Sequence, residues 1–463
     1  MNPILLVVAI PFLAAGAWVF VYVARHPIWA AYLFLATQPF VGGIDRGSLI
    51  PLMRPSEFIQ LMLTAAVLCG IAVRAARGER LTVRFTRLDR AVVILAAVSS
   101  IWPLFWLFAR GRLPSSTDAF DTVVLWRLAS LYALFRLVVR TPEQVRRCLW
   151  VLLVSASLLS VLALLDSLGI YKPGGPWVAQ LSDSGTGRGG ATLNSAIAVG
   201  DYLGYSFAVA SVWLLRRREP RRLIAVMTGI IFLGILGTGQ FSAWFELIIV
   251  VVVVAANTGQ IRQLMKWIVP VSIVGAIVAW PVLSTRLAGF GSGQGLLPHS
   301  WQGRIDNLTN FYIPRLSGFK WVLGVRPDTV LPAPETWRVV IYLESGYLWL
   351  FWVGGIPLVL AFLWFLRRGF KTTRQVIATR ADDIGVAAIA TRAALWCLLI
   401  LSLIDPHLTL RGGADLFFCL LGLAANQNVP PTNIDAPLER PQLELVQAPT
   451  DLSEVRMHRA SGP

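Results

Sequence analysis

Long apolar stretches separated by short polar connections recur along almost the whole chain. Each holds about 20 mostly apolar residues, the length that an α-helix needs to cross a bilayer. The pattern predicts helices over residues 3–24, 27–44, 56–73, 90–109, 120–138, 147–168, 191–215, 223–239, 241–257, 267–283, 343–366, 384–404 and 413–425. The second and the last are short. We therefore expect an all-α, polytopic transmembrane helix bundle of about 12 to 13 spans, with residues 1–425 as the helical domain.

The composition supports a membrane protein. Of the 463 residues, 56% are hydrophobic and only 14% are charged, whereas a soluble domain has roughly 45–50% apolar and 25% charged residues. One water-surrounded core cannot hide this much apolar side chain. The composition excludes a soluble enzyme, a disordered protein and a fibre.

Basic residues predict how the chain crosses the membrane. They cluster in the connections at 74–90, 136–147, 216–222, 262–266 and 367–380. Short connections rich in Arg and Lys stay in the cytoplasm. If all five clusters are cytoplasmic, the connections alternate consistently between the two sides of the membrane. Residues 426–463, rich in Pro, Gln and Asn, then form a disordered cytoplasmic tail. The connections 110–119, 169–190 and 284–342 lie on the outer side.

The connection 284–342 is the longest, and it is unusually basic for an outer loop. It carries Arg286, Arg304, Arg315, Lys320, Arg326 and Arg338. A connection of this length within a compact protein is usually functional. We expect the active site there. His299, in the same loop, is a candidate base, although a solvated loop histidine has the same sequence signature.

The net charge of +16 comes almost entirely from Arg. A GC-rich genome and a need for guanidinium groups, which match phosphate, both explain this bias. Most of these residues flank apolar spans and do not form one exposed patch, so we expect no nucleic-acid partner. The four cysteines have no metal-ligand spacing. They are interpreted as packing residues, and no metal or other cofactor is expected.

Five ionisable residues within or beside the predicted spans are candidates for a functional site in the membrane. They are Arg127, Asp166, Asp201, Glu246 and Arg392. A charge within a span by default marks a functional site or has a partner. Asp166 is close to a span end and is expected at the interface. Two interpretations of the arginines stay open: they belong to a functional site, or they brace the bundle by pairing with Asp201 or Glu246.

Three outer segments carry candidate chemistry. In residues 183–194, glycines flank Arg188 ahead of a span, which suits an anion because free N–H groups lie beside the cation; a flexible hairpin has the same sequence. The second segment is 300–306, with Arg304. The third is 343–348, with Glu344, followed by the glycines of 354–356. The helix dipole also favours a carboxylate such as Glu344 at the start of a span.

The order of these segments resembles the bacterial O-antigen ligase and Wzy-type polysaccharide polymerase superfamily, integral-membrane glycosyltransferases of the GT-C kind. The resemblance covers about residues 120–425 and includes Arg188 to Asn194, Thr238-Gly239, Gly303-Arg304 and the element 344–348. It departs at 240–242, where Gln-Phe-Ser replaces the family's Ser-Arg-Gly. It departs again at Glu344-Ser345, where ligases have His-Asn. The second departure favours a polymerase.

The resemblance implies a GT-C-like fold and a reaction that uses no nucleotide sugar, metal or other cofactor. The enzyme would transfer a glycan from undecaprenyl diphosphate to an acceptor glycan, with inversion, at the periplasmic face of the bacterial inner membrane. Membrane lipid and a chain-length regulator are candidate partners. Ligation to lipid A core is the alternative activity. A transporter for lipid-linked glycans, which would need internal repeats and broken helices, and a structural scaffold are further alternatives.

Site residues are assigned on this basis. Arg188 and Arg304 would hold the diphosphate through bidentate contacts, with Arg286 and Arg338 in support, and Glu344 would be the general base. Substrate-binding candidates are Asn194, Trp301 and Tyr347. Aromatic side chains that would stack on sugars or anchor the loop at the interface are Trp301, Tyr312, Trp321 and Trp337.

Overall fold

The computed structural model is a bundle of α-helices. It describes residues 3–79, 84–171, 188–216, 220–291, 299–334, 339–426 and 429, with the side chains of 3–13, 289–291, 299 and 300 excepted. Every predicted span overlaps a helix, although the bounds differ by several residues, as where the span 267–283 runs past the end of the helix Ile261–Val278. These helices are α1 (Pro3–Arg25), α2 (Ile28–Val41), α3 (Pro55–Ala76), α4 (Arg87–Ala109), α5 (Ser116–Val138), α6 (Pro142–Ser167), α7 (Ala196–Leu215), α8 (Arg221–Gly237), α9 (Phe241–Thr258), α10 (Ile261–Val278), α14 (Gly346–Thr379), α15 (Asp383–Leu401) and α16 (Gly413–Ala424).

Eight of the described helices are long and apolar enough to cross a membrane. They are α3, α4, α6, α7, α9, α10, α14 and α15. The segment Ala14–Arg25 of α1, together with α2 and α16, forms shorter apolar helices. The protein is therefore a multi-pass α-helical membrane protein, and crossings beyond these eight stay a prediction.

Several helices begin where side chains satisfy the first backbone N–H groups. Thr86, Ser115 and Thr141 each accept a hydrogen bond from the N–H group three residues on. The side chains of Asp89, Asp118 and Gln144 return the contact to the capping residue's own N–H. Such reciprocal capping stabilises a helix start by about 1 kcal/mol and fixes where these spans begin.

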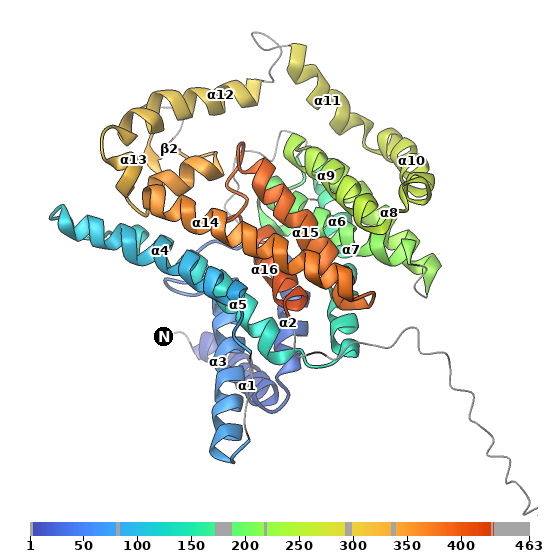
Figure 1. Ribbon diagram of the computed structural model, residues 1–463, viewed down its shortest axis with the longest axis horizontal. Coiled ribbons are helices and arrows are strands. Elements are labelled where there is room, and N and C mark those ends of the chain that lie inside the picture. Colours follow the sequence, from blue (N-terminus) through green and yellow to red (C-terminus); the bar gives the residue numbers. More distant parts are fainter. Residues whose placement is uncertain are drawn as a thin grey trace, which may run out of the picture.

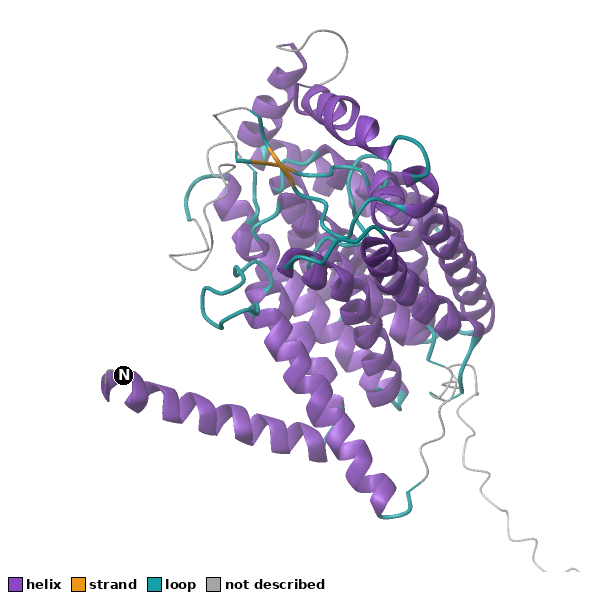
Figure 2. Cartoon of the chain, turned by 90° about the vertical axis from the view of Figure 1, so that its left-hand side faces the viewer, coloured by secondary structure: helices purple, strands orange, loops and turns teal. Residues whose placement is uncertain are grey.

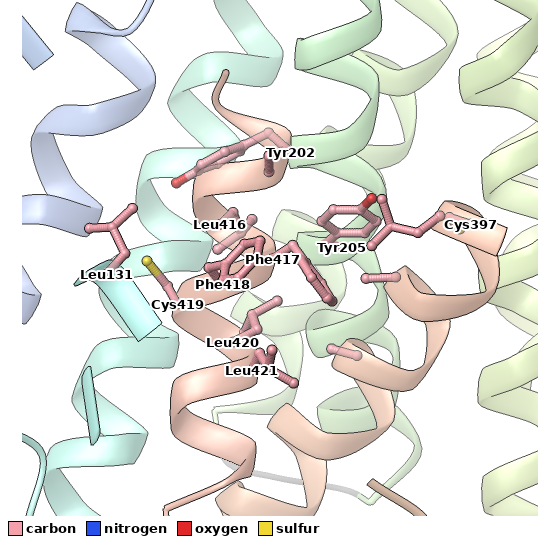
Figure 3. Close-up of a cluster of buried hydrophobic side chains, with 14 of the residues drawn as sticks. Leu131, Tyr202, Tyr205, Cys397, Leu416, Phe417, Phe418, Cys419, Leu420 and Leu421 are labelled. Atoms are coloured by element: carbon pink, nitrogen blue, oxygen red, sulfur yellow. The ribbon is translucent and has the colours of Figure 1, made fainter. Parts of the chain in front are cut away.

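Helix α7 lies at the centre of the bundle. In the most apolar stretch of α7, 94% of the residues are buried, whereas in that of α10, at the periphery, 11% are buried. Figure 3 shows Tyr202 and Tyr205 of α7 beside Phe417 and Phe418 of α16. The ring of Phe418 stacks on that of Phe365 in α14 with centroids 5.9 Å apart. Close packing around α7 and α16 therefore fixes the positions of residues at the ends of these two helices.

Two of the predicted packing cysteines belong to this core. Cys397 and Cys419 are buried with it (Figure 3), and Cys148 is buried on α6. Cys69 is exposed. The packing interpretation therefore holds for three of the four cysteines.

Hydrogen bonds join the connections at each end of the bundle to one another. At one end, Gly43 N–H donates to Thr192 O, Arg110 to Gly324 O, and Gly346 N–H to Ser402 O. We call this the loop end; it comprises the described parts of 42–54, 110–115, 168–195, 238–240, 279–345 and 402–412. At the other, Asn426 donates to Val139 O. We call this the arginine-rich end, since the predicted basic clusters gather there.

The described part of the connection 284–342, which the sequence predicts as one long outer loop, contains several short helices and a hairpin. It contains α11 (Trp280–Gly291), α12 (His299–Asn307), a π-helical turn (Leu308–Tyr312), a 3₁₀ turn (Ile313–Leu316), α13 (Lys320–Leu323) and a hairpin of β1 (Leu331–Pro332) and β2 (Val340–Ile341). In Figure 1, α10, α11 and α12 arch along one edge of the molecule. Figure 2 shows the hairpin among loops at one end of the bundle, while α1 projects away from it.

Residues 320–328 of this connection are clamped onto the bundle. The side chains of Trp102 on α4 and of Arg110, directly after α4, donate to carbonyl groups of residues 323–325. Arg326 pairs with Asp118 of α5 at 3.2 Å. Trp352 of α14 donates to Asp328 O. Polar contacts from three helices therefore hold the segment in place.

Candidate functional site

Three segments far apart in the sequence bring ionisable side chains together at the loop end. Arg304 lies in the last turn of α12, Glu344 precedes α14, and Asp405 lies between α15 and α16. The Nη1 atom of Arg304 donates to Asp405 Oδ2 at 3.1 Å. Its Nε lies 3.7 Å from Glu344 Oε2. We call Arg304, Glu344 and Asp405 the outer cluster; two of the predicted site residues meet in it.

Burial gives the three side chains different roles. The side chains of Asp405 and Arg304 are 1% and 13% exposed, while that of Glu344 is 34% exposed. Asp405 therefore anchors the guanidinium from inside. The 3.7 Å separation between Arg304 Nε and Glu344 Oε2 is longer than a hydrogen bond but is within ion-pair distance. Glu344 is the carboxylate of the cluster that a substrate can reach.

The start of α14 is bound to the end of α15, which sets the spacing between Glu344 and Asp405. Ser345 caps α14 by accepting from Leu348 N–H. The N–H groups of Gly346 and Tyr347 both donate to Ser402 O, at 2.8 and 3.1 Å. A Cβ atom at Gly346 would lie 2.8 Å from Ser402 Cβ, so only glycine permits this approach.

Beneath Asp405, His407 forms a buried ion pair with Asp201 of α7. His407 Nδ1 lies 2.9 Å from both carboxylate oxygens, and its backbone N–H donates to Asp405 O. Burial lowers the pKa of His407, but the carboxylates of Asp201 and Asp405 together raise it, and the pKa lies above its usual value. The pair anchors the 402–412 connection to the central helix.

Glu246 of α9 extends the series of ionisable groups into the bundle. Its side chain is fully buried beside Asp201. Among the described residues neither of its carboxylate oxygens has a hydrogen-bond partner. A Cβ atom at Gly204 would lie 2.3 Å from Glu246 Oε1, so a glycine on α7 makes room for this carboxyl group.

A second buried pair joins Arg127 of α5 to Asp415 of α16, with Nη1 and Oδ1 2.6 Å apart. Gln38 of α2 also donates to Asp415. The interpretation that Arg127 pairs with Asp201 or Glu246 is therefore wrong. No spacing rule relates residues in distant spans. The sequence therefore could not show that Arg127 pairs with Asp415, near the start of a short span.

Asp166 is confirmed as a residue at a helix end, and it supports the segment that follows Arg188. Its Oδ2 accepts from Ala191 N–H at 3.0 Å. Gly189 N–H donates to Gly237 O, and a Cβ atom at Gly189 would lie 2.3 Å from Ala163 O. Arg188 is therefore held at the loop end, half-buried, by close packing of its glycine neighbour between α6 and α8.

Asn194 has a structural function in this element. It ends a short 3₁₀ helix (Ala191–Leu193) with φ at +54°. Asn adopts this left-handed conformation more readily than most residues. Ser195 then caps α7 by accepting from Ala198 N–H. The Asn-Ser pair is thus a turn-and-cap signal, which the substrate-binding assignment overlooked.

The other predicted site residues are distributed as follows. Arg286 is half-buried on α11, and its Nε and Nη2 have no hydrogen-bond partner among the described residues. Trp301 is half-buried on α12. The Tyr347 hydroxyl donates to Leu399 O at 2.6 Å, so this ring packs against α15. Arg338, Trp337 and the His299 side chain lie outside the described residues.

Tyr312 is not available to sugars or to the interface. It is fully buried, and its hydroxyl bonds Thr329 O at 2.8 Å and Ile341 O at 2.9 Å. Burial raises its pKa. Its ring packs on Trp352 with centroids 5.1 Å apart. Tyr312 therefore connects the hairpin to α14, while Trp321, 36% exposed, keeps an accessible face.

The outer cluster has no excess of positive charge, since Arg304 faces two carboxylates. Attraction of an anion would therefore require Arg188 or Arg286 as well. Within the described part of the chain, no group of three or more His, Cys, Asp and Glu side chains could hold a metal ion. The arrangement suits proton transfer by Glu344 and hydrogen bonding by Arg304.

The fold and the cluster define a class: a multi-pass helical membrane protein with an arginine–carboxylate site at one end of its bundle. Comparison with known proteins does not narrow this class. No protein-family model matches the chain, and no curated protein matches it either.

Sequence reasoning overlooked Asp405, His407 and Asp415. All three lie in or next to the short connection between the last two spans, within the sequence Asp-Pro-His-Leu-Thr-Leu-Arg-Gly-Gly-Ala-Asp. Three acidic or imidazole groups within eleven residues, between two apolar helices, are the signal that would have found them.

Proposed function

We propose that the protein is a glycosyltransferase that uses a lipid-diphosphate-linked glycan, most closely a polysaccharide polymerase of the Wzy type. The site would face the periplasm of a bacterial inner membrane. The observation that carries the proposal is the meeting of Arg304 and Glu344, 3.7 Å apart. The family resemblance gives these two residues complementary roles, and they come from segments forty residues apart in the chain.

In the proposed reaction, an acceptor hydroxyl oxygen attacks the anomeric carbon of the donor sugar. The new C–O bond forms as the bond from that carbon to the phosphate oxygen breaks, and the lipid diphosphate leaves with the electron pair. Glu344 takes the hydroxyl proton. A single displacement inverts the anomeric configuration.

Arginines stabilise the negative charge that develops on the diphosphate in this reaction. Arg304 keeps N–H donors beyond the one given to Asp405, because a guanidinium carries five. Arg188 and Arg286 supply the further positive charge that the outer cluster lacks, and Arg338 is the remaining candidate. A well-placed donor of this kind contributes on the order of 10²–10³ in rate.

Ligation to lipid A core remains the alternative within the same chemistry, because it changes the acceptor only. Glu344-Ser345 at the position of the ligases' His-Asn favours the polymerase. A chain-length regulator is then a further partner to seek.

A transporter for lipid-linked glycans is the second candidate, and one observation favours it. Asp201, Glu246 and His407 form a buried ionisable group reaching into the bundle, and such groups mark proton relays in transporters. The accessible carboxylate beside Arg304 favours the enzyme, because a relay does not require a base at the surface.

The proposal predicts that Arg304→Ala and Arg188→Ala abolish polymer in cells that depend on this protein. Glu344→Gln should reduce polymer by about 10²-fold or more, because the base is lost. Polymer would be measured on gels, with the amount of protein in the membrane measured in parallel.

Arg315→Gln and Asp306→Asn are matched controls. Both residues are exposed in the same connection, and Arg315 contacts the Phe311 carbonyl four residues before it. The two control variants should leave the amount of polymer unchanged. Full polymer output from Glu344→Gln would overturn the base assignment.

A further inference from the structure

The arginine-rich end contains a cavity of about 880 Å³. It lies between the start of α4, the second half of α14, the start of α15 and the end of α16. We call it the basic cavity. Its described lining is Thr86, Arg87, Leu88, Arg368, Lys371, Thr372, Gln375, Val376, Ala378, Thr379, Arg380, Ile384, Ala424, Ala425, Asn426 and Val429.

The basic cavity has a strong excess of positive charge. Arg87, Arg368, Lys371 and Arg380 line it, and no carboxylate belongs to its described lining. The charge of Arg380 is compensated by an ion pair with Asp382, which does not belong to the lining. The Nε atom of Arg368 is buried without a hydrogen-bond partner among the described residues. An unpaired buried donor on a cation favours an anionic ligand.

The position of the cavity along α14 indicates its depth. From Gly346 to Leu366 the helix carries no charged side chain. The helix is broken at Gly355, and its uncharged second part, from Ile356 to Leu366, is roughly 16 Å long at 1.5 Å per residue. Arg368 and Lys371 follow within five residues of Leu366, and cations in this position are typical of the point where an apolar helix leaves the hydrocarbon layer.

We propose that the basic cavity binds the phosphate headgroup of an anionic phospholipid. The cations would hold the phosphate, and Leu88, Val376 and Ile384 supply apolar wall for the glycerol and upper acyl carbons. Basic pockets between membrane helices bind such headgroups on the cytoplasmic side. Inorganic phosphate carries the same anionic group but has no apolar part that could contact the apolar wall. The proposal does not rest on glycosyl transfer.

The test uses the full-length protein purified in a neutral detergent. Phosphatidylglycerol, phosphatidylcholine or inorganic phosphate is titrated at constant ionic strength, and the thermal unfolding midpoint is measured. Phosphatidylglycerol should raise the midpoint saturably, while the other two should not. In the double variant Arg368→Gln/Lys371→Gln, the concentration for half the effect should rise roughly 10- to 30-fold, since each cation near an anionic lipid contributes about one factor of five.

The double variant Arg367→Gln/Arg374→Gln is the matched control. It removes two exposed cations from the same helix, and neither lines the cavity. The control should respond like the natural protein. Equal weakening in both double variants would overturn the proposal in favour of general surface attraction. An equal response to inorganic phosphate would overturn the assignment to a lipid.

Discussion

Arg304 shows how one residue type acts differently according to its neighbours. Its sequence context favours a phosphate-binding cation, and in the structure it faces two carboxylates. The charge pattern of the connections predicts that Arg304 lies on the outer side of the membrane. Its partner Asp405 could not be predicted, because 101 residues separate the two and no local periodicity relates them.

His407 makes stability depend on pH. Its pKa is raised in the folded state. The pair with Asp201 therefore stabilises the protein fully below the ordinary pKa of 6.5, and this contribution is lost as the pH rises through the pKa of the folded state. The thermal midpoint of the purified protein should therefore fall as pH is raised above about 7. Thermal unfolding in detergent across about pH 6–9 measures this directly.

His407→Gln should flatten that pH dependence, because the amide does not titrate in this range. Breaking a buried pair costs about 3 kcal/mol, so this variant should also be less stable at low pH. His26→Gln is the control, since His26 is exposed at the other end of the bundle. An unchanged pH slope in His407→Gln would contradict the account of this pair.

At the scale of elements, the apolar pattern predicted every span helix but not the structure of 284–342. The helices α11 to α13 are short, and the connection's contacts with α4, α5 and α14 are long-range. A search for apolar stretches of about 20 residues does not detect elements this short. The motif at 354–356 also has a local physical basis that the family resemblance did not supply.

That basis is a break in α14 at Gly355, which has φ +60° and ψ −154°. A Cβ atom there would lie 2.1 Å from Val322 O. Gly355→Ala should therefore lower the free energy of unfolding by about 2 to 3 kcal/mol and loosen residues 320–328. Thermal unfolding and proteolysis of the purified variant measure both effects.

Gly303→Ala is the matched control for this substitution. Gly303 lies in α12 with an ordinary helical φ, and a Cβ atom there would meet nothing within 4 Å among the described residues. Alanine at this position should be neutral or slightly stabilising. Equal loss of stability in the two variants would show that the break in α14 is not the cause.

For the whole molecule, the two ends have different electrostatics. The loop end holds an arginine–carboxylate cluster with one accessible acid, and the arginine-rich end holds the basic cavity. The alternation of basic connections anticipated this division. The pairing of the buried polar groups around α7 could not be anticipated, because it depends on which helices become neighbours.

The most direct test of the central claim, glycan transfer at the outer cluster, is a reaction with purified components. The protein in detergent is given an undecaprenyl-diphosphate-linked oligosaccharide, and products are separated by mass. The natural protein and Arg315→Gln should lengthen the glycan, while Glu344→Gln and Arg304→Ala should be slower by about 10²-fold or more. A natural protein that leaves the oligosaccharide chemically unchanged, or a Glu344→Gln variant as fast as the natural protein, would contradict the claim.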